Sequence, residues 1–125
     1  MEIPEELLYT EEHEWVYVDG DVAIVGITDY AQGELGDVIF VELPEVGNHV
    51  QQLEPFGSIE AVKTVSDVFA PVTGEIVEVN SELDSNPQLI NQDPYGEGWI
   101  VKIKMTDPKE LESLLSAEEY QNMIE

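Results

Sequence analysis

The sequence predicts a mainly β protein that folds as a compact sandwich or barrel. About seven short runs rich in β-branched and aromatic residues are separated by Pro, Gly and Asn. The 125 residues are 42% hydrophobic, which suits one core in a single domain spanning 1–125. Helical patterning is concentrated in the tail, at about 107–125. Together these observations predict a β core that is closed by short C-terminal helices.

The first predicted element is a hairpin near the N-terminus. Residues 14–18 and 21–25 are β-rich runs, and the Asp-Gly dipeptide between them suits the positive φ of a tight turn. A short helix is predicted to follow, because Thr28 is a good cap and the glycines at 33 and 36 would end the helix.

The middle of the chain predicts further strands and an internal repeat. The predicted strands are 38–43, 57–62, 68–71, 75–79 and 99–104. Residues 36–41 resemble 74–79, and residues 57–63 resemble 98–104. Two copies are too few for a solenoid, so we expect a pair of β units about a pseudo-twofold axis, with a core at about 36–104. Because the matches are short and apolar, a chance likeness is the alternative.

The tail predicts two short amphipathic helices that dock on the sheet core. Asp107 is a suitable cap, and Pro108 stands at the first helical position. The run from Ser116 to Glu119 forms a capping box for the second helix.

The charge and the missing cysteines exclude several classes of protein. The chain has 28 acidic residues against four lysines and no arginine, a formal net charge of −24. Nucleic-acid and anionic-membrane binding need a basic surface and are therefore not expected. Without cysteine, any thiol or disulfide chemistry must come from an attached group. We expect a cytoplasmic protein, or an organelle-matrix protein whose leader was removed, and self-repulsion favours a monomer.

Lys63 is isolated in the sequence, because every other lysine lies at residue 102 or later. It falls between the predicted strands 57–62 and 68–71, so a turn at 63–66 should present its side chain to solvent. An ordinary surface lysine is the plain interpretation. The functional interpretation is an exposed amine that accepts an acyl group.

The residues around Lys63 resemble a known modified hairpin. Residues 57–76 are similar to the hairpin of lipoyl and biotinyl domains, in which the modified lysine lies at the tip and a Pro-Val-x-Gly run, here 71–74, opens the second half-repeat. Biotin carriers typically have Met on both sides of the lysine, whereas this chain has Val62 and Thr64. The resemblance therefore favours lipoate.

The rest of the chain resembles the glycine cleavage system H-protein family, from about Leu8 to the C-terminal helices. The resemblance implies a barrel-sandwich hybrid of two β half-repeats, with an N-terminal hairpin and short C-terminal helices. A lipoyl domain of a 2-oxo acid dehydrogenase acyltransferase would be shorter and would lack those additions. The motifs that carry the likeness are at 9–16, 26–32, 35–44 and 89–99.

The resemblance implies a carrier that is not itself an enzyme, with lipoate attached to Lys63 as N6-lipoyl-lysine. The implied partners are a pyridoxal-phosphate glycine decarboxylase, a tetrahydrofolate-dependent aminomethyltransferase, dihydrolipoamide dehydrogenase and a lipoate-attaching enzyme. The first loads an aminomethyl group, the second passes it on, and the third reoxidises the dithiol. Two alternatives stay open: a lipoyl relay that donates lipoate to other proteins, and an unmodified acidic β module that binds partners.

The resemblance also implies roles for five other residues. Glu60 and Gly74 match positions that the lipoate-attaching enzyme reads, although Gly74 could instead be needed for a positive φ. Glu12, Glu14 and Asp67 match a cleft that shelters the loaded arm, and for Glu12 and Glu14 the plain alternative is that they are solvated strand and turn acids. No metal site is expected, because the two histidines lack metal-ligand spacing.

Overall fold

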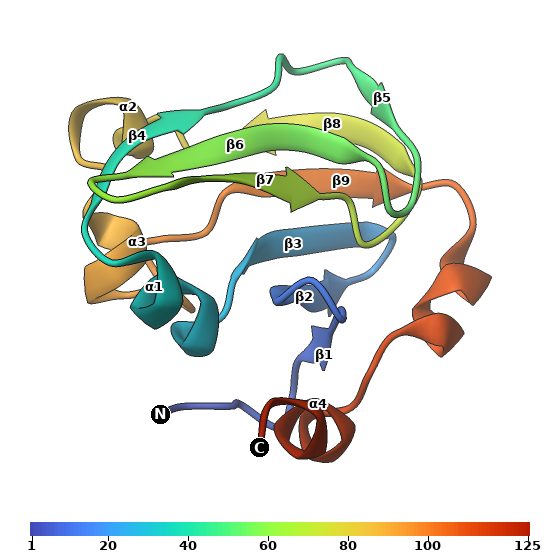
Figure 1. Cartoon of the computed structure of the whole chain (residues 1–125). Coiled ribbons are helices and arrows are strands. Elements are labelled where there is room, and N and C mark those ends of the chain that lie inside the picture. Colours follow the sequence, from blue (N-terminus) through green and yellow to red (C-terminus); the bar gives the residue numbers. More distant parts are fainter.

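The computed structural model describes all 125 residues as two antiparallel β-sheets that face each other, with short helices around them (Figure 1). The first sheet has the order β1-β2-β3-β9-β8-β5 and the second the order β4-β6-β7. The strands are β1 (Leu8–Tyr9), β2 (Glu14–Asp19), β3 (Val22–Ile27), β4 (Val38–Glu42), β5 (His49–Val50), β6 (Pro55–Ala61), β7 (Val65–Phe69), β8 (Gly74–Val79) and β9 (Val101–Met105). The helices are α1 (Asp29–Leu35), α2 (Glu82–Ser85), α3 (Leu89–Gln92), the 3-10 helix η1 (Pro108–Ser113) and α4 (Ala117–Ile124). The mainly β prediction is confirmed.

The two sheets contain matching strand pairs. β4 pairs with β6 in one sheet, and β8 pairs with β9 in the other, both antiparallel. The register shifts between Val38 and Phe40 in the first pair and between Ile76 and Glu78 in the second. These irregularities fall at corresponding places in the predicted repeat. A shared irregularity is not expected from chance apolar similarity, so the arrangement supports two β half-repeats.

The core lies between the sheets and contains 17 buried residues. Ile59 from β6, Ile76 from β8 and Ile103 from β9 are each at most 1% exposed. Burying such a side chain stabilises the fold by about 1.5–3 kcal/mol. Inward residues alternate with outward ones in β9, as expected for strands with one buried face.

A second cluster holds the C-terminal helix, and here the prediction is partly wrong. Tyr120 of α4 stacks on Tyr9, with ring centroids 4.7 Å apart, in a cluster completed by Leu7 and Trp15. α4 therefore docks beside β1 and not on the main core. The first predicted helix is the 3-10 helix η1, and Leu111 within it and Leu114 directly after it pack against the main core. The predicted capping box is confirmed at Ser116.

Other differences from the prediction have local causes. β7 starts at Val65, three residues earlier than predicted. The prediction missed the first half of this strand because those residues are exposed and show no apolar alternation. α1 runs through Gly33 and ends at Gly36, which has a φ of 81°. β1 and β5 are two residues long and α2 and α3 four, too short for a periodic signal. None of the helices has the length and apolar character needed to cross a membrane.

Candidate functional site

Lys63 lies at the turn that joins β6 to β7, as the sequence predicted, and its side chain is exposed. The Ala61 N–H donates to the Thr64 carbonyl at 2.7 Å and closes the turn. Neither Val62 nor Lys63 has a positive φ, so the turn needs no glycine. The hairpin therefore presents one primary amine at its end.

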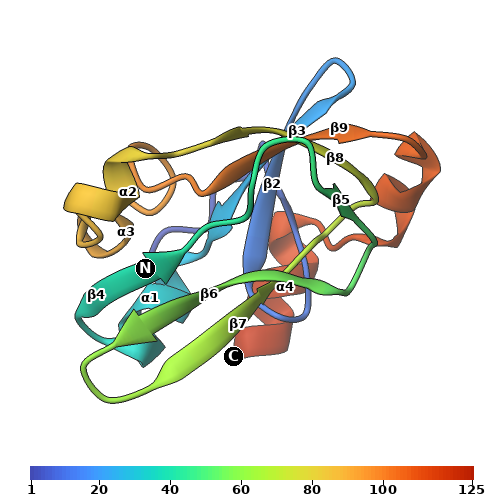
Figure 2. The ribbon, with the colours of Figure 1, turned by 90° about the horizontal axis from the view of Figure 1, so that it is seen from above.

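This turn is fixed to the chain between α1 and β4. The Val62 N–H donates to the Asp37 carbonyl at 3.0 Å. A Cβ added to Gly36 would lie 3.4 Å from Cε of Lys63, so the lysine stem passes close over this glycine. In the view of Figure 2 the β6–β7 turn and α1 lie at the same end of the molecule. The turn is thus hydrogen-bonded to a second segment, and the end of the lysine side chain lies close to that segment.

Asn91 braces that second segment and was not predicted as a functional residue. Its side-chain amide donates to the Gly36 carbonyl at 2.8 Å, and its side-chain oxygen accepts from the Val38 N–H at 2.9 Å. The same amide donates to Gln32 at 3.0 Å. Asn91 lies in a motif that carried the family resemblance, which was the only signal available for it.

Glu60 and Gly74, the two predicted recognition residues, lie in different sheets. Glu60 is exposed on β6 and is paired in register with Phe40 on one side and Val65 on the other. Gly74 is buried at the start of β8, and its φ is not positive. The alternative that Gly74 provides a positive φ is therefore wrong. A Cβ at Gly74 would collide with the Lys104 carbonyl oxygen, so close packing against β9 is what requires glycine.

A cleft of about 230 Å³ lies between α1 and β7, and it brings together Glu12, Glu14 and Asp67. Glu12 and Asp67 have exposed side chains. A further exposed acid, Glu34 of α1, also lines the cleft and was not predicted. Ile59 contributes to the apolar part of the wall. The structure therefore places three predicted site residues around one acidic cleft, although they are distant in sequence.

Glu14 differs from the other acids because it is only 1% exposed. The Thr10 hydroxyl donates to its Oε1 at 2.5 Å, and the Phe69 N–H donates to its Oε2 at 3.1 Å. Burial raises the pKa of the Glu14 carboxyl to about 7, although these hydrogen bonds favour the ionised form. The alternative that Glu14 is a solvated strand acid is therefore wrong. Its carboxyl group joins β2 to β7 at the base of the cleft.

His13 is a second residue of the cleft that the sequence did not identify. Its Nδ1 lies 2.8 Å from the Tyr120 hydroxyl, which lies 2.7 Å from the Thr28 hydroxyl. Burial lowers the pKa of the His13 imidazole. This chain of hydrogen bonds connects the cleft wall to α4. No group of three or more His, Cys, Asp or Glu side chains is arranged to hold a metal ion.

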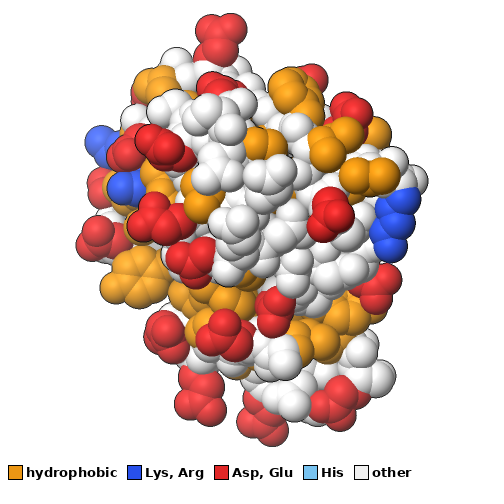
Figure 3. Space-filling model, turned by 90° about the vertical axis from the view of Figure 1, so that its left-hand side faces the viewer, with side chains coloured by type: hydrophobic (Ala, Val, Ile, Leu, Met, Phe, Trp, Pro, Cys, Tyr) orange, Lys and Arg blue, Asp and Glu red, His pale blue; other side chains and the backbone are white.

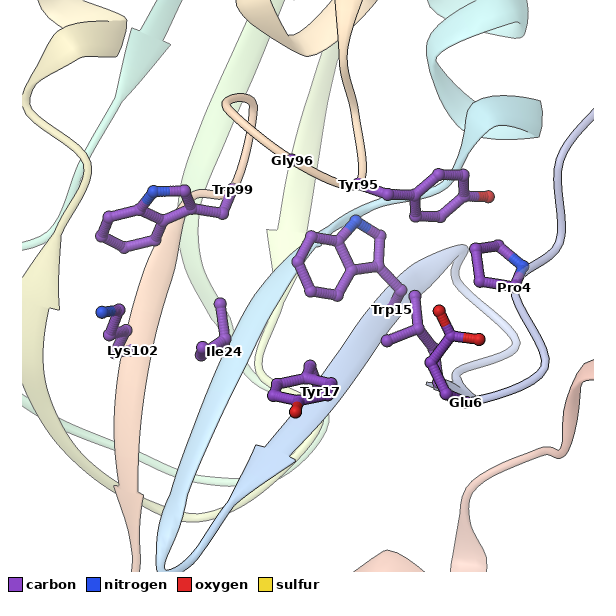
Figure 4. Close-up of a pocket in the computed structure, with 10 residues that line it drawn as sticks. Pro4, Glu6, Trp15, Tyr17, Ile24, Tyr95, Gly96, Trp99 and Lys102 are labelled. Atoms are coloured by element: carbon purple, nitrogen blue, oxygen red, sulfur yellow. The ribbon is translucent and has the colours of Figure 1, made fainter.

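A larger pocket of about 370 Å³ lies on the outer face of the six-stranded sheet and contains none of the predicted site residues. Figure 4 shows Trp99 and Lys102 on one side of it and Pro4 and Glu6 on the other, with Trp15 between them. The Lys102 ammonium lies 5.1 Å from the Trp99 ring centroid, and it also pairs with a glutamate of β8. The ammonium group of Lys102 is therefore already engaged within the chain.

The surface around these features is strongly acidic. Figure 3 shows acidic side chains spread over one face of the molecule, with cationic side chains at only a few places near its edges. Lys63, Lys104 and Lys109 are the exposed lysines of the chain, and only Lys63 lies at the tip of a hairpin.

Comparisons with known proteins agree with this geometry. The family model described as "Glycine cleavage H-protein" matches residues 7–125. A glycine cleavage system H protein of Halothermothrix orenii is 59% identical, over 100% of this chain and 98% of its own, and that of Staphylococcus carnosus is 54% identical, over 99% and 98%. The crystal structure of a glycine cleavage system H protein from Mycobacterium marinum matches with a TM-score of 0.89 at 43% identity, covering 97% of this chain and 98% of that one.

Proposed function

We propose, from the premise that this chain belongs to the glycine cleavage H-protein family, that it is the lipoyl carrier of a glycine cleavage system. Lipoate is attached through an amide bond to Nζ of Lys63. The observation that carries this proposal is the single exposed amine at the tip of a braced hairpin, within the motif that resembles lipoyl domains. The chain is a carrier subunit and not an enzyme, and residues 1–125 act as one carrier domain.

The residues of the tip fit such a group. The amine of Lys63 is exposed, and backbone hydrogen bonds fix the turn that carries it. The lysine side chain and a lipoyl chain together span roughly a dozen bonds, a reach on the order of 15 Å. When attached, lipoate would supply the pair of sulfur atoms, as a disulfide or as a reduced dithiol, on which glycine decarboxylase, the aminomethyltransferase and dihydrolipoamide dehydrogenase act in turn. Tethering gives these enzymes a high local concentration of the reactive group.

The acidic residues of the cleft beside the hairpin protect the protonated aminomethyl group that the lipoyl arm carries. Glu12 and Asp67 are exposed carboxylates that can accept charge-assisted hydrogen bonds from a protonated amine. Both oxygens of Glu14 already accept hydrogen bonds, so its part is to hold the base of the cleft. The lifetime of the aminomethyl-loaded carrier tests this role. Asp67→Asn should shorten it, and an unchanged lifetime would remove Asp67 from the proposal.

Glu60 and Gly74 contribute to recognition by the lipoate-attaching enzyme in different ways. Glu60 is exposed near Lys63 and can contact that enzyme directly. Gly74 is buried, so its contribution is to let β8 pack closely on β9 and keep the shape of the second half-repeat.

The mass of the intact protein, purified from its native host, tests the proposal. We expect the increment of one lipoyl group, located on Lys63 by peptide mapping and absent in Lys63→Ala. An unmodified lysine would instead favour an acidic β module that binds partners without a cofactor. The relay alternative is tested by incubating carrier bearing isotope-labelled lipoate with an acceptor lipoyl domain, because only a relay transfers the label. The protein acts as a monomer in the cytoplasm.

A further inference from the structure

Exposed apolar side chains gather around the hairpin that carries Lys63. Phe40, Glu60 and Val65 are paired in register across β4, β6 and β7, and we call these three residues the tip row. Phe40 is 52% exposed and Val65 is 63% exposed. Val62 in the turn and Ile39 beside Phe40 are exposed as well, at 73% and 48%. The tip row is therefore an acid between two apolar residues, with more apolar surface around it.

This grouping distinguishes the tip from the rest of the surface. The other large exposed hydrophobic residues are scattered over the chain ends, loops and other strands; they are Met1, Tyr17, Val18, Val46, Leu53, Val77 and Met123. Single exposed apolar residues are normal, whereas a contiguous group usually marks a contact surface. The exposure of Phe40, Glu60 and Val65 shows that no other segment of the chain covers the three-stranded sheet at these residues.

The position of the tip row determines which partner it fits. An enzyme that acts on Nζ of Lys63 must bring its reacting atoms within bonding distance of the tip, so its surface has to cover the residues beside the lysine. The enzymes that act on the far end of the arm work roughly a dozen bonds away and have no such requirement. The tip row is thus most directly explained by the enzyme that acylates the lysine.

We propose that the tip row, with Phe40 and Val65 as apolar anchors on either side of Glu60, is the docking surface for the lipoate-attaching enzyme. This inference rests on the proposed function, because it assumes that Lys63 is acylated. The partner surface would have an apolar recess for Phe40 and a cationic group facing Glu60. Aromatic side chains commonly provide most of the binding energy of such contacts.

The reaction that this docking serves is a simple acyl transfer. With lipoyl-adenylate as the donor, neutral Nζ of Lys63 attacks the lipoyl carbonyl carbon and forms the amide bond. The bond from that carbon to the adenylate phosphate oxygen breaks, and AMP and one proton leave. Docking aligns the amine with the carbonyl, and no oxidant or reductant is needed.

The test compares attachment rates for purified unmodified variants, using the lipoate-attaching enzyme and lipoyl-adenylate. We expect Phe40→Ser to lower kcat/KM for attachment at least tenfold, and Val65→Thr to lower it severalfold. Val77→Ser changes an exposed valine on the other sheet and should have no effect. Equal unfolding midpoints will show that the variants remain folded.

A second measurement separates this inference from the proposed function. Phe40→Ser that has been fully lipoylated by prolonged reaction should be turned over by glycine decarboxylase at the wild-type rate. An unchanged attachment rate in Phe40→Ser overturns the inference, and so does a loss confined to decarboxylase turnover. If the wild-type protein is not acylated on Lys63 at all, the proposed function itself fails.

Discussion

Replacing Glu14 with glutamine should make the stability of the protein less dependent on pH. The pKa of the folded Glu14 carboxyl is raised by burial from 4.5 to about 7. Between these values the folded protein holds a proton that the unfolded chain releases. The folded state therefore binds more protons, and this group lowers stability as the pH rises through that window.

The magnitude follows from the size of the shift. One pKa unit corresponds to about 1.4 kcal/mol, and for these two pKa values the loss between pH 5 and pH 8 amounts to about 2.5 kcal/mol. Glutamine has the shape of the protonated acid. Its oxygen can accept from the Phe69 N–H, and its amide can donate to the Thr10 hydroxyl oxygen. Glu14→Gln should thus resemble the wild type at pH 5 and gain about 2.5 kcal/mol over it by pH 8.

The assay is urea denaturation of both proteins at several pH values and constant ionic strength. The difference between the two proteins is the informative quantity, because other groups also titrate in this range. His13, whose pKa burial lowers, adds stability as the pH rises and so acts in the opposite direction. Glu112→Gln removes one charge from an exposed position and controls for the change in net charge. If the wild-type and Glu14→Gln curves run parallel from pH 5 to pH 8, our account of Glu14 is wrong.

Three further predictions concern other features. Gly74→Ala should lower the free energy of unfolding by several kcal/mol, because its Cβ would collide with the Lys104 carbonyl oxygen. Gly33→Ala, which has open space around its Cβ, should be neutral or slightly stabilising and is the matched control. Thermal unfolding of the two variants measures the difference, and equal losses of stability would contradict the role of Gly74. Asn91→Ala should weaken the brace under the hairpin and speed hydrogen exchange of the Val62 amide by tenfold or more, and an unchanged exchange rate would contradict the brace. Turnover with glycine decarboxylase should fall as the salt concentration rises, because a net charge of −24 favours partner enzymes with basic surfaces. The distance over which charges attract shrinks from about 10 Å at 0.1 M salt to about 3 Å at 1 M. Turnover that does not change with salt would exclude this attraction.

Local features of this fold could be predicted from the sequence, and long-range ones could not. The exposed turn at Lys63 was predictable because the strands on either side of it adjoin it in the chain. Tyr120 was missed because its partners, Tyr9 and Thr28, come from the other end of the sequence. The grouping of Glu14 with Asp67 was expected only from the family resemblance, since no local pattern reports that β2 and β7 lie close together.

For α4, the helix itself could be predicted from the sequence, but the place where it docks could not. Its helical periodicity and its capping box were readable, so its existence and start were predicted correctly. Its docking site was not, because the tail carries apolar residues that suit either cluster. The choice depends on the aromatic surface that Tyr9 and Trp15 offer, and this surface exists only after β1 and β2 have paired.

The hydrogen bond between Glu14 and Phe69 also has a consequence for solubility. β7 is an edge strand of its sheet, and edge strands with free N–H groups can recruit strands from other molecules. The Phe69 N–H is already occupied by the Glu14 carboxylate, and Asp67 places a charge two residues earlier on the same strand. The edge that borders the cleft is therefore protected against strand addition at these two residues, although it lies open to solvent.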